Sequence, residues 1–301
     1  MRKAVRLART AKEKFLAEKS DIRDEDIKIA LSLGPYGSTV NANEFDGLYP
    51  PPFGPGDPTR NTFLSGEDDL REASLEALKN FHLERLRVFS EDKESWESID
   101  WIAFETTPLW REVTAIRMAM TVLEEDAGKK PWWVSTVHPA GKYPEPAASG
   151  EPAASYSDDE GLVSARQIVR ASLGEDPSYK YLSVPTGVGV NCTGVAFLQN
   201  ILENMSTAIK EFRADGSGHY HKPSLVVYPN GIEWDLEKKT WKGHVIGDGS
   251  AKARVQSLVQ TIRPYAQENE GVWGSIIVGG CCKFGPDEIS ALASEVAQFN
   301  I

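Results

Sequence analysis

The chain has 301 residues, of which 41% are hydrophobic and 26% are charged, and its formal net charge is -11. This acidic balance argues against a nucleic-acid partner, because phosphates would repel the chain and we find no basic patch to overcome the repulsion. No apolar run approaches the ~20 residues that a membrane helix needs, so a membrane partner is not predicted either. A chain of this length suits one α/β barrel or two smaller domains.

The N-terminal stretch and the cysteine count predict the compartment of the protein. Residues 1–8 predict an amphipathic helix and lack the apolar core of a signal peptide. Their arginines leave a mitochondrial presequence as an alternative, which the acidic residues Glu13, Glu18 and Asp21 weaken. Because the chain has few cysteines and no secretion signal, we expect a reducing compartment and predict a cytoplasmic protein.

Hydrophobic periodicity predicts helices and strands that alternate along the chain. The helices are expected at residues 2–18, 68–89, 109–125, 158–173, 195–213, 250–267 and 286–299. The strands are short, continuous and apolar, and are expected at residues 27–33, 101–104, 132–137, 188–192, 224–228 and 275–278. Segments rich in proline, glycine or polar residues predict a long loop at 38–66, a mobile loop at 138–157 and a polar insert at 233–247.

This alternation of strand, loop and helix indicates right-handed βαβ units and a parallel sheet covered by helices. We therefore predict an α/β fold of the barrel type, in a single domain over residues 1–301. Neither a dinucleotide-binding glycine motif nor a P-loop is present. Polar residues follow the carboxyl ends of the strands, which is where a barrel carries its chemistry. They are Glu105, Ser135, Asn191, Cys192, Asn230, Cys281 and Cys282.

The three cysteines lie in two places, each at the end of a predicted strand. Cys192 ends one strand, and Cys281 and Cys282 follow the apolar run 276–278. Three thiolates from two strand ends could form an open Zn²⁺ site, with the fourth tetrahedral position left for a substrate. Vicinal cysteines are poor disulfide partners, because their Cα atoms lie closer (~3.8 Å) than ordinary bridge geometry requires. Buried free cysteines without a metal, and a thiol redox pair formed by Cys281 and Cys282, remain the alternatives.

Five short motifs resemble those of the homocysteine S-methyltransferases. GVNC at 189–192 and GGCC at 279–282 look like the two zinc motifs of that family. Residues 32–37 (SLGPYG), 104–106 (FET) and 228–230 (YPN) resemble further signatures in the same order, so the match covers nearly the whole chain. The resemblance implies a (β/α)₈ TIM barrel.

The resemblance also implies a metal and a reaction. Cys192, Cys281 and Cys282 would hold Zn²⁺, and a methyl group would pass from S-methylmethionine or S-adenosylmethionine to homocysteine, giving methionine. Betaine is a possible donor in related enzymes but is less expected here. A free thiol with a pKa near ~8.5 is mostly protonated at neutral pH, whereas a thiol bound to Zn²⁺ loses its proton. Transfer from a sulfonium cation to a thiolate removes charge, which a dry pocket favours.

Four polar residues are the candidates for substrate binding. Glu105 resembles the family's acidic residue that holds the homocysteine amino group, although a solvated or salt-bridged loop carboxylate is the alternative. Asn191 and Asn230 could orient the substrate or the zinc ligands through their amides, and could equally cap turns. Ser135 is a weaker candidate, as is Tyr36.

The chain also departs from the family pattern. The family's barrel opens with a strand ending in Asp-Gly-Gly and a second strand ending in a Thr-Asn-Thr-like sequence, and this chain has neither. Six of the eight strands are therefore predicted, and Lys283 and Phe284 stand where the family usually has arginine and threonine. A shortened gene product, an incomplete gene model and an altered protein all stay open. The alternative to an active enzyme is thus an impaired remnant that binds zinc or a partner.

Two missing strands predict an open sheet. The strands at 27–33 and 275–278 should be its two ends, because closing a gap of ~14 Å would change tilt and shear throughout the barrel. Unpaired edges of this kind are liable to aggregate or to capture a partner. The first helix is expected to pack on the outside of the first strand through Val5, Ala8 and Phe15.

Overall fold

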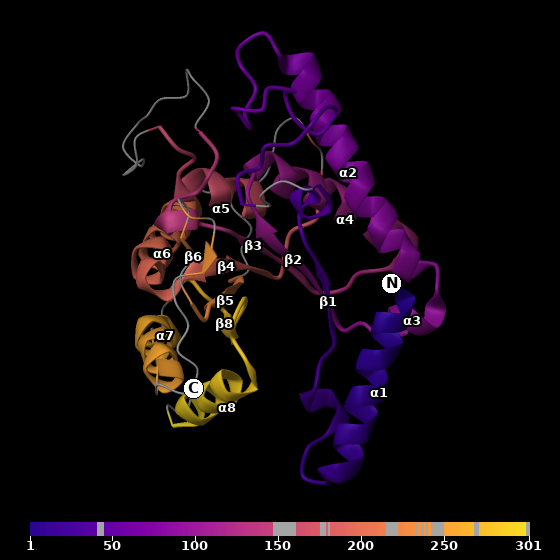
Figure 1. The fold of residues 1–301 in the computed structure, drawn as a ribbon. Coiled ribbons are helices and arrows are strands. Elements are labelled where there is room, and N and C mark those ends of the chain that lie inside the picture. The colour runs from indigo at the N-terminus through magenta and orange to yellow at the C-terminus, as the bar shows by residue number, and fades with distance from the viewer. Residues whose placement is uncertain are drawn as a thin grey trace.

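The structure is a computed structural model with a central sheet and helices around it (Figure 1). It describes residues 1–40, 45–146, 161–174, 179, 181–214, 222–232, 234, 235, 238, 240, 241, 250–267 and 271–298. Within these ranges, every helix is too short or too polar to cross a membrane.

Six parallel strands form the central sheet, in the order in which they occur along the chain. They are β1 (Ala30–Leu33), β2 (Trp101–Thr107), β3 (Trp132–Thr136), β4 (Gly187–Gly194), β5 (Ser224–Asn230) and β8 (Ser275–Val278). The predicted parallel sheet is therefore confirmed. A short antiparallel pair, β6 (Trp234–Asp235) and β7 (Thr240–Trp241), lies within the predicted polar insert.

The described residues form eight α-helices, and seven of them lie where the sequence predicts a helix. They are α1 (Arg2–Glu18), α2 (Asp68–Ser90), α3 (Lys93–Glu97), α4 (Trp110–Ala127), α5 (Ala165–Leu173), α6 (Leu198–Ala214), α7 (Ser250–Gln267) and α8 (Pro286–Ala297). Periodicity misses α3 because it has only five residues. Helix α5 begins later than predicted, where Ser164 and Gln167 form a capping box.

The helices and the outer face of the sheet form the main apolar core. In β1, Leu31 and Leu33 are buried in this core, whereas the alternate residues Ala30 and Ser32 are exposed. The central strands β4 and β5 are buried along almost their whole length, and β8 is only partly buried. Burial thus falls from the centre of the sheet toward both ends, as expected for end strands that pair, within the described part of the chain, with one strand each.

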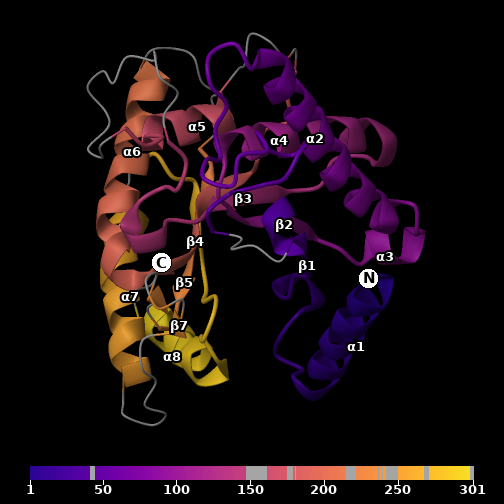
Figure 2. The ribbon, with the colours of Figure 1, turned by 45° about the horizontal axis from the view of Figure 1, so that its top comes forward.

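The two ends of the sheet are β1 and β8, as predicted. In the described part of the chain, β1 pairs only with β2, and β8 pairs only with β5. Both views show these end strands separated from each other (Figures 1 and 2). The prediction of a six-stranded sheet that does not close is confirmed.

Of the three α1 residues predicted to pack on the first strand, only Val5 joins the apolar core that contains Leu31 and Leu33 of β1. Val5 is buried, but Ala8 is exposed and Phe15 is 43% exposed. The guanidinium Nε of Arg2 donates a hydrogen bond to the carbonyl of Val88 at 2.6 Å, and the helix extends from α3 away from the sheet (Figure 2). An amphipathic pattern shows which face is apolar, but it does not show which element will cover that face.

The prediction of a mobile loop at 138–157 is wrong for the part of it that the structure describes. Tyr143 and Glu145 are buried, and a carboxylate oxygen of Glu145 lies 3.5 Å from the guanidinium of Arg111. Burial raises the pKa of Glu145 to about 8. Residues 147–157 lie outside the described part of the chain. A composition rich in proline and alanine does not reveal that Glu145 pairs with Arg111 or that the ring of Tyr143 packs in a buried apolar cluster.

Glu112 anchors the beginning of the predicted long loop to α4. Its carboxylate is fully buried and accepts hydrogen bonds from the backbone N–H of Tyr36 at 2.7 Å and the hydroxyl of Tyr49 at 2.6 Å. The ring nitrogen Nε2 of His82 lies 3.0 Å from the same carboxylate. One buried carboxylate therefore contacts three polar groups, on Tyr36, Tyr49 and His82, and so connects the loop to α2 and α4.

Candidate functional site

The three cysteine sulfurs meet at one end of the sheet. Cys192 lies in β4, Cys281 and Cys282 follow β8, and the three sulfur atoms lie within 4.8 Å of one another. Strand β5 lies between β4 and β8 in the sheet, and its last residues together with Gly231 hold the pair in place. The N–H of Cys281 donates to the carbonyl of Pro229 at 2.7 Å, and the N–H of Gly231 donates to the carbonyl of Cys282 at 2.8 Å. Because the strands are parallel, the GVNC and GGCC motifs, which are far apart in the sequence, meet at the same end of the sheet.

The backbone around the sulfurs is unusual. Thr106, Cys192 and Lys283 have φ angles of 62°, 49° and 63°, in the left-handed region that residues other than glycine rarely adopt. The register of β2 shifts beside the first of them, and the register of β4 shifts beside the second. Such irregularities re-aim side chains, and strained residues of this kind concentrate at functional sites.

The sulfur positions fit a thiolate-bound metal. The sulfurs of Cys192 and Cys281 lie 2.7 Å apart. Tetrahedral Zn²⁺ with Zn–S bonds near ~2.3 Å keeps sulfurs ~3.8 Å apart, so the two atoms need to separate by about 1 Å. Hydrogen bonds with Cys281 and Cys282, followed by burial, raise the pKa of the Cys192 thiol. The crowded thiols therefore resist ionisation unless a cation lies between them.

Asn191 and Thr106 place hydrogen-bond donors beside two of these sulfurs. Both residues are buried. The amide nitrogen of Asn191 lies 3.8 Å from the sulfur of Cys281, and the hydroxyl of Thr106 lies 3.5 Å from the sulfur of Cys192. Groups that hydrogen-bond to metal ligands fix the orientation of those ligands and tune the metal.

Glu105 lies on the same end of the sheet. Its carboxylate accepts a hydrogen bond from the hydroxyl of Ser32 in the end strand β1, and it also interacts with the hydroxyl of Tyr228. Burial raises the pKa of Glu105, and the negative charge of Cys281 raises it further. Because these partners are hydroxyl groups, the charge of the carboxylate is available to a cationic group of a substrate.

The sequence model described as homocysteine S-methyltransferase matches residues 1–296. The chain belongs to the homocysteine S-methyltransferase family. As a member of this family, it is a methyltransferase that acts on homocysteine.

Named relatives and a solved structure resemble most of this chain. Homocysteine S-methyltransferase 1 of Arabidopsis thaliana is 26% identical over 304 residues, which cover 99% of this chain and 71% of the relative. Betaine-homocysteine S-methyltransferase of Drosophila melanogaster is 25% identical over 304 residues, covering 100% of this chain and 72% of the relative. The apo crystal structure of the homocysteine methyltransferase MmuM from Escherichia coli covers 97% of this chain and 71% of its own, with a TM-score of 0.49 and 20% identity.

Two further residues that the sequence predicts for the site of this homocysteine S-methyltransferase, Ser135 and Asn230, are buried close to the three cysteines. Ser135 is fully buried, and its hydroxyl contacts Asn191 and Tyr228. Asn230 is 5% exposed, and among the described residues its Oδ1 atom has no hydrogen-bond partner. An amide oxygen left without a donor is suited to a substrate N–H. Thus Ser135 supports other residues, and Asn230 keeps a free acceptor.

Sequence reasoning missed two residues of the site, Thr106 and Tyr228. Both belong to motifs that carry the family resemblance, FET and YPN, and this was the only signal for them. Their roles depend on hydrogen bonds between strands that are neighbours in the sheet but far apart in the sequence. No spacing rule in a single sequence predicts such bonds.

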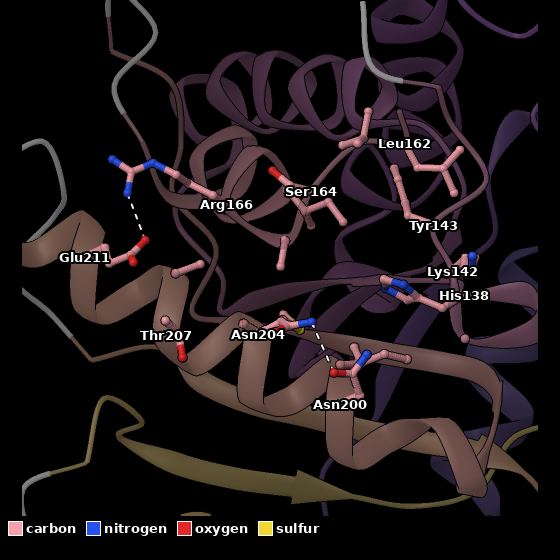
Figure 3. Close-up of a pocket in the computed structure, with 17 residues that line it drawn as sticks. His138, Lys142, Tyr143, Leu162, Ser164, Arg166, Asn200, Asn204, Thr207 and Glu211 are labelled. Atoms are coloured by element: carbon pink, nitrogen blue, oxygen red, sulfur yellow. Dashed lines mark hydrogen bonds and ion pairs between the residues drawn. The ribbon is translucent and has the colours of Figure 1, made fainter. Parts of the chain in front are cut away.

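A separate cavity of about 330 Å³ lies between α5 and α6 (Figure 3). Arg166 and Glu211 form an ion pair of 3.0 Å at one end of it, and His138 and Tyr143 lie at the other. Burial lowers the pKa of His138 to about 4, so this imidazole is neutral at pH 7. None of the cysteines lines the described wall of the cavity, so it is distinct from the cysteine cluster.

Proposed function

We propose that the chain transfers a methyl group from S-methylmethionine or S-adenosylmethionine to homocysteine, giving methionine, with Zn²⁺ held by Cys192, Cys281 and Cys282. The meeting of three thiols within 4.8 Å at the end of the sheet supports this proposal most strongly. Three cysteine ligands suit Zn²⁺ and leave one tetrahedral position for the thiol of a substrate.

The chemistry of the proposed reaction divides between the metal and the protein. Bound Zn²⁺ would supply the positive charge that lowers the pKa of a substrate thiol and keeps it as a thiolate. The new bond joins the homocysteine sulfur to the methyl carbon, while the electron pair of the broken bond returns to the donor sulfur and cancels its positive charge. Thr106 and Asn191 would orient the cysteine ligands through their hydrogen bonds.

Two side chains are suited to the amino-acid part of homocysteine. The Glu105 carboxylate matches its ammonium group, and Asn230 Oδ1 offers an unpaired acceptor. Ser135 and Asn191 would orient other residues and would not contact the substrate, because both are fully buried and are hydrogen-bonded to each other at 2.8 Å. A single domain over residues 1–301 and a cytoplasmic location stay predictions.

The direct test is methionine formation from homocysteine by zinc-loaded protein, with S-methylmethionine, S-adenosylmethionine and betaine in separate reactions. We expect product with at least one sulfonium donor and none with betaine. Product from betaine alone would contradict the donor class. A folded, zinc-loaded protein that is inactive with every donor would instead support the non-catalytic remnant that binds zinc or a partner.

Replacing Glu105 with glutamine should weaken homocysteine binding. A hydrogen bond between charged groups contributes roughly 1.5–3 kcal/mol, so we expect KM for homocysteine to rise about 10- to 100-fold with a smaller change in kcat. Only the ionised carboxylate attracts the ammonium group, and burial raises the Glu105 pKa. In the unmodified protein KM should therefore fall as the pH rises through that pKa, and the variant should lack this dependence.

A matched control for this experiment is Glu125→Gln, because Glu125 is exposed on α4. Steady-state kinetics of both variants across the pH range would decide the role of Glu105. If Glu105→Gln keeps both the KM and the pH dependence of the unmodified protein, Glu105 does not bind the ammonium group.

A further inference from the structure

The orientation of the Asn191 side chain is fixed by a backbone group. The N–H of Thr106 lies 2.7 Å from Oδ1 of Asn191, and a backbone N–H can only donate. The atom that receives this hydrogen bond must therefore be the amide oxygen. The amide nitrogen consequently points toward the hydroxyl of Thr106, at 2.8 Å, and toward the sulfur of Cys281, at 3.8 Å.

This orientation determines the direction of the hydrogen bonds behind Asn191. The hydroxyl of Ser135 lies 2.8 Å from the same Oδ1 atom, which can only accept, so Ser135 must donate its single proton there. Ser135 also lies 2.6 Å from the hydroxyl of Tyr228. Because the Ser135 proton is already used, Tyr228 is the donor in this short hydrogen bond, and the Glu105 carboxylate, which also contacts this hydroxyl, competes for the same proton. The Nε1–H of Trp133 in turn donates to the oxygen of Tyr228 at 3.2 Å.

The same direction continues toward the sulfurs. Thr106 Oγ1 accepts a hydrogen bond from the Asn191 amide, so its own proton is free for the sulfur of Cys192 at 3.5 Å. The second N–H of the amide faces the sulfur of Cys281. A single chain of donors therefore runs from Tyr228 through Ser135 to Asn191, and both sulfurs receive a proton donor at its end.

We propose that Tyr228 is a positioning residue for the cysteine ligands: its hydroxyl holds Ser135, which holds the amide of Asn191 against the sulfur of Cys281. The inference rests on the proposed function, because it assumes that the cysteines bind zinc. Hydrogen bonds to thiolate sulfur stabilise the negative charge of the ligand, and loss of such outer contacts typically costs 10- to 100-fold in metal affinity.

The test compares Tyr228→Phe with Tyr143→Phe. Each variant removes one hydroxyl from a mostly buried tyrosine, but the hydroxyl of Tyr143 has no hydrogen-bond partner among the described residues. Zinc affinity would be measured by competition with a chromogenic chelator, and the thiolate-to-metal absorption of Co²⁺-loaded protein would report the ligand geometry. We expect Tyr228→Phe to bind zinc about tenfold more weakly and to shift the Co²⁺ band, and Tyr143→Phe to match the unmodified protein.

A second variant guards against a general loss of stability. Ser135→Ala breaks the same chain one step closer to Asn191, and it should reproduce the weaker zinc binding and the shifted band. Variants that lower the unfolding temperature but keep the zinc affinity and the Co²⁺ spectrum would overturn the positioning role. If the unmodified protein bound no zinc, the proposed metal and this inference would both fail. If it bound zinc and the variants bound it equally well, only this inference would fail, so the two failures are distinguishable.

Discussion

Serine at any one of positions 192, 281 and 282 should release zinc and abolish methyl transfer. A hydroxyl is a poor ligand for Zn²⁺ beside two thiolates, so the zinc content should fall from about one ion per chain to nearly none. Without the ion, the substrate thiol keeps an ordinary pKa near ~8.5 and is mostly protonated at pH 7. Elemental analysis of zinc and the methionine assay would measure the two effects on the same preparation.

The fold should survive these cysteine substitutions, because the core lies between the sheet and the helices rather than at the sulfurs. Thr193→Ser is a suitable control, since it changes the next residue of β4 and keeps the hydroxyl that hydrogen-bonds to the backbone N–H of His138. A triple serine variant with undiminished zinc would refute the ligand assignment.

Alanine at Glu112 should produce the largest loss of stability among the substitutions considered. It would leave the N–H of Tyr36, the hydroxyl of Tyr49 and the ring of His82 buried without their acceptor. Removing one partner from a buried charged network costs roughly 3–5 kcal/mol. Urea unfolding, followed by circular dichroism, would measure the change in the free energy of unfolding.

Glu125→Ala is the control for Glu112→Ala, because it removes an exposed carboxylate from the same helix. Exposed substitutions of this kind usually change stability by less than about 0.5 kcal/mol. If the Glu112 variant unfolded with a free energy within about 1 kcal/mol of the unmodified protein, the network would not anchor the loop after β1 in the way described.

The cysteine cluster was predictable because it depends only on the order of the strands. Once β4 and β8 are parallel and separated by one strand, the residues after their carboxyl ends must share one end of the sheet. Thr106 and Tyr228 were not predictable in the same way. The roles of these two residues arise from a residue of β2 in the left-handed backbone conformation and from the register of four neighbouring strands, and a single sequence shows neither.

The errors in the fold have a common physical cause. Phe15 and Ala8 were predicted to lie on a buried face, but α1 has little of the sheet to pack against, and both side chains are exposed. Conversely, Tyr143 and Glu145 lie in a segment whose composition predicts a loop, yet they are buried because α4 and α5 provide partners. Local patterns give the polarity of a segment, whereas its burial depends on what the rest of the chain brings beside it.

The position of the cysteine pair after the end strand β8 has a thermodynamic consequence. Among the described residues this strand pairs with one neighbour, and it is only partly buried, so its amide protons should exchange with solvent more readily than those of β4. An ion shared by Cys192 and the pair would bind only when β8 is docked on the sheet, so its binding free energy would also hold the strand in place. Zinc binding and the docking of β8 on the sheet are therefore linked equilibria. The free zinc concentration would set the fraction of molecules in which β8 is detached from the sheet.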